Sequence, residues 1–187
     1  MSGLFSDIEF LFNAAVRFHQ QGNLQRASEL YDRVQEISPQ HAMSLNNQAL
    51  IAKAVGRLDL SWSMLQEARQ CEPENFEILA NLGRVALQKG DYAVAFNHLS
   101  KALEIRSDDR NLQMCLARSL FNLGRHGQAR AILKGLARNH TKCAETYYLL
   151  GLIALEENAD MQASGYFQQA LRLEPDHAGA LKQVNEP

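Results

Sequence analysis

The residues best suited to catalysis or metal binding in this sequence are six histidines and three cysteines, and their spacing favours neither activity. The histidines are His19, His41, His98, His126, His140 and His177. They show no metal-ligand spacing and no accompanying nucleophile, and the glycines form no phosphate-binding loop. Cys71, Cys115 and Cys143 form no C-x-x-C pair, which argues against a disulfide framework and fits a reducing compartment. We predict no catalytic residue, no metal and no cofactor.

The composition excludes two further classes of function. The chain of 187 residues is 46% hydrophobic and 21% charged, with a formal net charge of -2 and a pI near 6.3. This balance gives no basic footprint for nucleic acid. The first residues, MSGLFSDIEFLF, contain no basic segment and no long apolar run, so neither a signal peptide nor membrane insertion is expected. We predict a cytoplasmic protein.

A 34-residue repeat organises the chain. Its clearest copy, residues 144–177, reads AETYYLLGLIALEENADMQASGYFQQALRLEPDH. Similar segments occur at intervals of 34 residues before this copy. We predict a single array over residues 1–187, with repeats at about 8–41, 42–75, 76–109, 110–143 and 144–177 and a partial C-terminal capping helix at 178–185. In this frame we expect the six histidines to fall in different columns.

Three columns of the repeat indicate two antiparallel helices per unit. Small residues recur in the first column, which is Ala15, Ala49, Gly83, Ala117 and Gly151. Large residues recur sixteen positions later, at Tyr31, Leu65, Leu99, Leu133 and Phe167. A small residue facing a large one lets two helices pack closely. The third column, Gly22, Gly56, Gly90, Gly124 and Asn158, predicts the stop of each first helix, because these residues tolerate the left-handed conformation.

Two polar segments predict helix starts. Ser6 is followed three residues later by Glu9, a capping box that predicts the start of the first helix near Ser6. The proline that ends other repeats is replaced by Ser107, and the pair Asp108 and Asp109 that follows can cap the next helix.

The clearest repeat carries a recognisable family pattern. Tyr147, Leu150 and Gly151 are followed by Ala163 and Phe167 and then by Pro175. This spacing resembles the tetratricopeptide repeat. The resemblance implies an all-α fold, a right-handed alpha-alpha superhelix (TPR solenoid) of antiparallel helix pairs, whose first helices line a concave groove.

The first-helix positions that do not pack within a repeat contain the candidate binding residues. Asn13, Asn47 and Asn81 occupy one column, and such a ladder of amides can donate to and accept from the backbone of an extended peptide. The column resembles the asparagine ladder in the tetratricopeptide superhelix of O-linked N-acetylglucosamine transferases. The alternative is that these asparagines hydrogen-bond between neighbouring helices.

Cations and one aromatic residue complete the predicted groove. Arg84 and Arg118 share a column, and Lys53 lies in a neighbouring one, so this part of the groove can attract a carboxylate. The alternative is that they are solvated cations with local glutamate partners. The predicted peptide-binding residues are Asn13, Asn46, Asn47, Lys53, Asn81, Arg84, Arg118 and Tyr148.

These features predict a non-catalytic scaffold or adaptor that binds a peptide or helix of a partner protein. The alternative is a regulatory or substrate-selecting segment of a larger enzyme such as a glycosyltransferase, whose catalytic part lies outside this chain. Self-association through the ends of the repeat array is a third hypothesis, since an uncapped solenoid end can stack on another copy.

Overall fold

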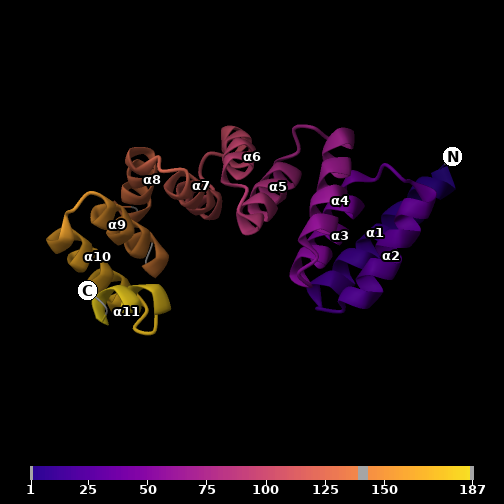
Figure 1. The fold of residues 1–187 in the computed structure, drawn as a ribbon. Helices are drawn as coiled ribbons and strands as arrows, with labels where there is room; N and C mark the ends of the chain where they lie inside the picture. The colour runs from indigo at the N-terminus through magenta and orange to yellow at the C-terminus, as the bar shows by residue number, and fades with distance from the viewer. Residues whose placement is uncertain (1, 139–142, 186–187) are drawn as a thin grey trace. The chain divides into compact units, whose positions relative to one another are not determined.

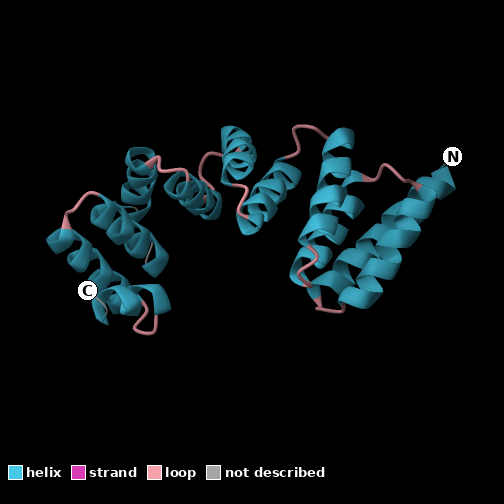
Figure 2. Ribbon diagram, viewed as in Figure 1, coloured by secondary structure: helices cyan, strands magenta, loops and turns pink. Residues whose placement is uncertain are grey.

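The computed structural model describes residues 2–138 and 143–185, and this part of the chain consists of helices and loops without a strand (Figure 1 and Figure 2). The helices are α1 (Ser2–Gln20), α2 (Leu24–Ile37), α3 (Ala42–Ala54), α4 (Leu58–Cys71), α5 (Phe76–Lys89), α6 (Tyr92–Ile105), α7 (Arg110–Asn122), α8 (His126–Arg138), α9 (Ala144–Glu156), α10 (Asp160–Leu173) and α11 (Ala178–Asn185). The predicted all-α fold of paired helices is confirmed.

The chain divides into two compact units. The N-terminal unit, Met1–Arg106, contains the helix pairs α1/α2, α3/α4 and α5/α6. The C-terminal unit, Ser107–Pro187, contains the pairs α7/α8 and α9/α10 and the short helix α11. Within each unit the helices of a pair run antiparallel and pack along their length, and each second helix also packs on the next first helix (Figure 1).

The turn inside each pair has the backbone conformation that the sequence predicts. Gly22, Gly56, Gly90 and Gly124 have φ between 70° and 84°. Asn158 occupies the same position in the last pair with φ of 57°, the only positive φ of a non-glycine residue among the described residues. An L-residue with a Cβ rarely adopts this region, and asparagine is the usual second choice after glycine. The predicted helix stops are confirmed.

The small and large columns meet at the seam between the two helices of a pair. A Cβ atom built on Gly83 of α5 would lie 2.5 Å from Cγ of Leu99 on α6. One built on Gly151 of α9 would lie 2.4 Å from Cε1 of Phe167 on α10. Both separations are far below a van der Waals contact, so these two seams close only because the small residue is glycine.

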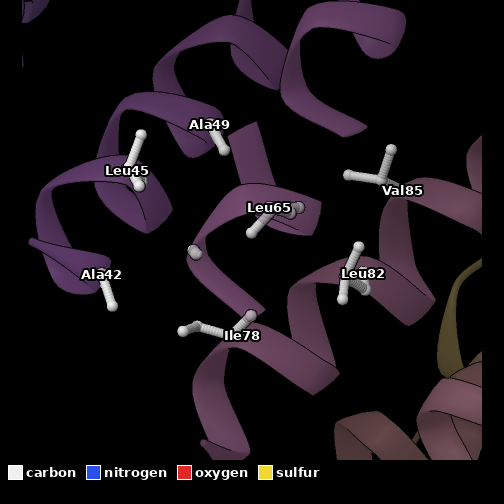
Figure 3. Close-up of a cluster of buried hydrophobic side chains, with 8 residues drawn as sticks. Ala42, Leu45, Ala49, Leu65, Ile78, Leu82 and Val85 are labelled. Atoms are coloured by element: carbon white, nitrogen blue, oxygen red, sulfur yellow. The ribbon is translucent and has the colours of Figure 1, made fainter. Parts of the chain in front are cut away.

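The core of the N-terminal unit continues from one pair to the next. Figure 3 shows α3 and α5 contributing Ala42, Leu45, Ala49, Ile78, Leu82 and Val85 around Leu65 of α4. Leu65, Ile78 and Leu82 have no exposed surface. Helix α4 is therefore held between two first helices, which fixes how the inner positions of α3 and α5 face each other.

One predicted helix start is confirmed and one is wrong. Oδ1 of Asp109 accepts a hydrogen bond of 2.9 Å from the backbone N–H of Leu112 and caps α7. Helix α1 begins at Ser2, so Ser6 lies inside it and does not cap it. No proline precedes Ser6 to stop the helix from extending towards the N-terminus.

Candidate functional site

Three of the predicted asparagines form a continuous chain of hydrogen bonds between α3 and α5, which we call the amide chain. Nδ2 of Asn81 donates to Oδ1 of Asn46 at 2.9 Å, and Nδ2 of Asn46 donates to Oδ1 of Asn47 at 3.2 Å. Nδ2 of Asn47 then donates to the hydroxyl of Tyr31 on α2 at 3.1 Å. Because each amide has a defined donor and acceptor, the chain fixes the orientation of all three side chains.

The side chains of the amide chain differ in how much of their surface is exposed. Asn46 and Asn81 are buried, with 2% and 6% of their surface exposed, whereas Asn47 is half-buried. Asn13, on α1, is exposed. The predicted ladder joined Asn13, Asn47 and Asn81, but the hydrogen bond between repeats runs from Asn81 to Asn46 in the neighbouring column. The alternative foreseen for these asparagines, bonding between helices, is what the structure shows for Asn81, which bonds to Asn46, and for Asn47, which bonds to Tyr31.

Tyr31 belongs to this network, although its column in the repeat predicts only packing. It has no exposed surface, and burial raises the pKa of its phenol while the hydrogen bond from Asn47 opposes this shift. Its column is otherwise filled by leucine and phenylalanine, so the hydroxyl was the one available signal. The buried hydroxyl of Tyr31 accepts the hydrogen bond from Asn47 and so fixes the orientation of that side chain.

The predicted cations of the N-terminal unit differ in their surroundings. Nη1 of Arg84 donates to Oδ1 of Asn81 at 3.2 Å, which extends the amide chain by a positive charge. Arg84 is half-buried on α5. Lys53 is half-buried in the last turn of α3, where its charge interacts favourably with the helix dipole.

A second polar contact ties α2 to α3 next to the amide chain. Gln48 is 5% exposed at a position that is usually apolar. Its Nε2 donates to Oδ1 of Asp32, and its Oε1 accepts from Nε2 of Gln35 at 2.6 Å. Both partners lie on α2, so the buried amide is satisfied by the preceding helix.

The remaining predicted residues, Arg118 and Tyr148, gather around Glu145 in the C-terminal unit. Nε of Arg118 on α7 lies 3.6 Å from Oε1 of Glu145 on α9. Oε2 of the same carboxylate lies 3.3 Å from Nε2 of His177. The ring of Tyr148 packs on His177 at 4.9 Å, and burial together with the charge of Glu145 raises the pKa of Tyr148. Arg118 thus pairs with a local glutamate, as the alternative interpretation of the predicted cations expects.

His41 and His177 occupy the same column, so the expectation that all six histidines differ in column is wrong. They lie four repeat lengths apart, and each Nδ1 accepts a backbone N–H at a helix start, from Ser44 at 3.2 Å and from Ala180 at 3.1 Å. Their rings also pack alike, His41 on Phe12 and His177 on Tyr148, both at 4.9 Å. Burial lowers the pKa of His41, and Glu72 partly opposes this shift. Each of the two histidines caps the helix that follows it.

Over the described ranges 2–138 and 143–185, no group of three or more His, Cys, Asp or Glu side chains is placed to hold a metal ion. No helix in those ranges is both long enough and apolar enough to cross a membrane.

Known proteins resemble this chain in sequence. Three family models described as tetratricopeptide repeats match residues 46–110, 86–153 and 144–177. Protein O-mannosyl-transferase TMTC1 of Homo sapiens is 24% identical over 144 residues, which cover 77% of this chain and 16% of that protein. DnaJ homolog subfamily C member 7 of Mus musculus is 28% identical over 99 residues, 53% of this chain and 20% of that protein. The chain thus spans a fifth or less of these two relatives.

Solved structures share the fold at low sequence identity. YrrB, a TPR protein with an unusual peptide-binding site, superimposes with a TM-score of 0.84 at 20% identity, over 94% of this chain and 90% of its own. MamA superimposes with a TM-score of 0.77 at 16% identity, over 96% and 95%. The repeat spacing, the glycine turns, the helix pairs and the family models agree, and the chain belongs to the tetratricopeptide repeat family.

Proposed function

We propose that the protein is a non-catalytic interaction module whose N-terminal unit binds an extended peptide of a partner protein along the inner positions of α1, α3 and α5. The tetratricopeptide fold generally serves as a scaffold for protein–protein interaction, and YrrB, which shares it, has a peptide-binding site. The observation that carries the proposal is the amide chain from Asn81 through Asn46 to Asn47.

The amide chain favours peptide binding because it removes a cost of recognition. A free asparagine loses rotamer entropy when it binds a ligand, but Asn47 is already held by Asn46 and by Tyr31. Only one of its two amide N–H groups is used by Tyr31, which leaves the other for a peptide carbonyl. Asn13 offers a further exposed amide from α1. An extended peptide presents N–H and C=O groups that such amides can read without regard to side chain.

Charge and apolar surface add selectivity on the same helices. Arg84 and Lys53 provide two half-buried positive charges, on α5 and α3. Met43 and Leu50 of α3 are half-buried apolar residues. We therefore propose a peptide with an acidic group and at least one apolar side chain as the preferred ligand.

The test is a selection of peptides from a displayed random library on the full chain, followed by affinity measurement with variants. Asn13→Ala is the cleaner variant, because the side chain is exposed and its removal leaves the fold unchanged. Together with Asn47→Ala, we expect affinity for the selected peptides to fall about tenfold, as for the loss of two hydrogen bonds of about 0.5–1.5 kcal/mol each.

The matched control is Gln70→Ala, which removes an exposed amide from the second helix α4. It should bind the selected peptides like the unchanged protein, and circular dichroism should show equal helicity for all variants. Equal affinity of the unchanged protein and of the Asn13→Ala/Asn47→Ala variant would show that these amides do not contact the peptide. Enrichment of no peptide at all would remove the proposed function.

A further inference from the structure

A polar concavity lies in the N-terminal unit between the second helices α4 and α6, and we call it the α4–α6 cleft. Its volume is about 500 Å³. Its polar lining residues are Arg69 from α4 and Asn97, His98, Ser100, Lys101 and Glu104 from α6. None of these residues belongs to the amide chain, so the cleft is independent of the proposed peptide site.

The two cations of the cleft, Arg69 and Lys101, form no ion pair within residues 2–138 and 143–185, although Glu104 lines the same cleft. Two positive charges on opposite walls of a concave surface raise the local concentration of anions. The excess of positive over negative groups in the lining therefore points to an anionic ligand.

His98 is the most unusual residue of the cleft. It is 7% exposed, and its Nδ1 atom is buried without a hydrogen-bond partner. The indole of Trp62 on α4 packs edge-on against its ring at 5.8 Å. Burial, reinforced by the charges of Arg69 and Lys101, lowers the pKa of His98 to about 4. A buried polar atom without a partner is a cost to folding, and a bound ligand is one way to supply that partner.

We propose that the α4–α6 cleft binds a phosphate monoester group, with Arg69 and Lys101 as its charged donors. Asn97, Ser100 and the neutral imidazole of His98 supply further N–H and O–H groups around the same space. A phosphate offers three acceptor oxygens to these donors and suits the guanidinium fork of an arginine, whereas a carboxylate offers only two oxygens. The phosphate comes either from a small phosphorylated molecule or from a phosphorylated side chain.

The ring resonance of His98 in the full-length protein reports directly on occupancy. It is assigned by its disappearance in His98→Gln and followed by NMR during titration with inorganic phosphate. We expect a saturable shift and an upward change in the pKa of His98, since a bound anion stabilises the imidazolium. A phosphoserine peptide and a sugar phosphate then distinguish the two sources, because the natural one should bind more tightly than inorganic phosphate.

The variant that tests the donors is Arg69→Gln/Lys101→Gln, which we expect to weaken phosphate binding by about tenfold or more. Its matched control, Arg33→Gln/Lys134→Gln, removes the same charge from exposed positions on α2 and α8 and should leave binding unchanged. Each of three results would overturn the proposal: no saturable shift, an equal response to acetate, or full binding by the cleft variant with its helicity intact.

Discussion

The seam between α5 and α6 allows a sharp test of the packing that defines the repeat. At Gly83 an added Cβ would lie 2.5 Å from Cγ and 2.7 Å from Cδ2 of Leu99, and 3.3 Å from the backbone nitrogen of the same residue. Leu99 has no exposed surface and cannot move outward into solvent. Gly83→Leu therefore forces the two helices apart or forces Leu99 out of its rotamer.

The size of the effect follows from two opposing contributions. Overpacking a core commonly costs about 1–3 kcal/mol, and a complete leucine side chain at this distance falls at the upper end of that range. Leucine is a better helix former than glycine, which returns about 0.8 kcal/mol. A net loss of about 1–2 kcal/mol remains, and for a chain of this length it lowers the melting temperature by about 2–8 °C.

The assay is thermal unfolding followed by circular dichroism, with Gly165→Leu as the control. Gly165 is also helical, on α10, but a Cβ there meets no atom within 4 Å. Gly165→Leu should keep only the gain in helix propensity and raise the melting temperature slightly. Adding Leu99→Ala to Gly83→Leu should recover part of the loss, because the smaller side chain makes room. If Gly83→Leu melts like Gly165→Leu, the seam does not pack as described.

Three further predictions concern polar residues. Because the folded pKa of His98 lies at about 4, below its ordinary value of 6.5, its contribution to stability is complete above pH 6.5 and is lost as the pH falls towards 4. That loss amounts to at most about 3 kcal/mol, and urea unfolding of His98→Gln should depend less on pH in this window. Asn46→Ala should cost about 1–3 kcal/mol in urea unfolding by leaving Nδ2 of Asn81 without an acceptor in the core, and a loss no larger than that of Asn13→Ala would contradict the amide chain. Asp109→Ala should lower stability by about 0.5–2 kcal/mol through loss of the α7 cap, and an unchanged midpoint would show that the cap is dispensable.

Much of the fold could be predicted from sequence because each element is set by a local rule. A glycine or asparagine with positive φ ends a helix wherever it stands, so a column of them gives the turns directly. Small and large columns identify the seam because sterics admit few alternatives, as Gly83 and Leu99 show. The start of α1 could not be read from Ser6, since a capping motif stops a helix only where the preceding residues do not continue it.

The candidate site could be predicted only in part. The sequence identified the asparagines as a group. It predicted that Asn81 lies next to Asn47, which shares its column, whereas the hydrogen bond from Asn81 goes to Asn46. Which of two adjacent side chains meets the next helix depends on a small rotation and shift of that helix, and tertiary packing sets both. The role of Tyr31 could not be predicted from its column, because its ring packs like the leucines and the phenylalanine there and only its hydroxyl bonds to Asn47. His98 was treated as incidental, since its partners come from a different helix pair.

The amide chain also has a consequence for how the N-terminal unit unfolds. In a repeat array, each unit is stabilised by its own packing and by its interface with the next, so cooperativity spreads only as far as those interfaces are strong. Hydrogen bonds from α5 to α3 and from α3 to α2 strengthen two successive interfaces. Separating either interface would leave buried polar groups without a hydrogen-bond partner, which is costly. Amide hydrogens of α2, α3 and α5 should therefore exchange with solvent as one group with a common opening free energy, rather than repeat by repeat.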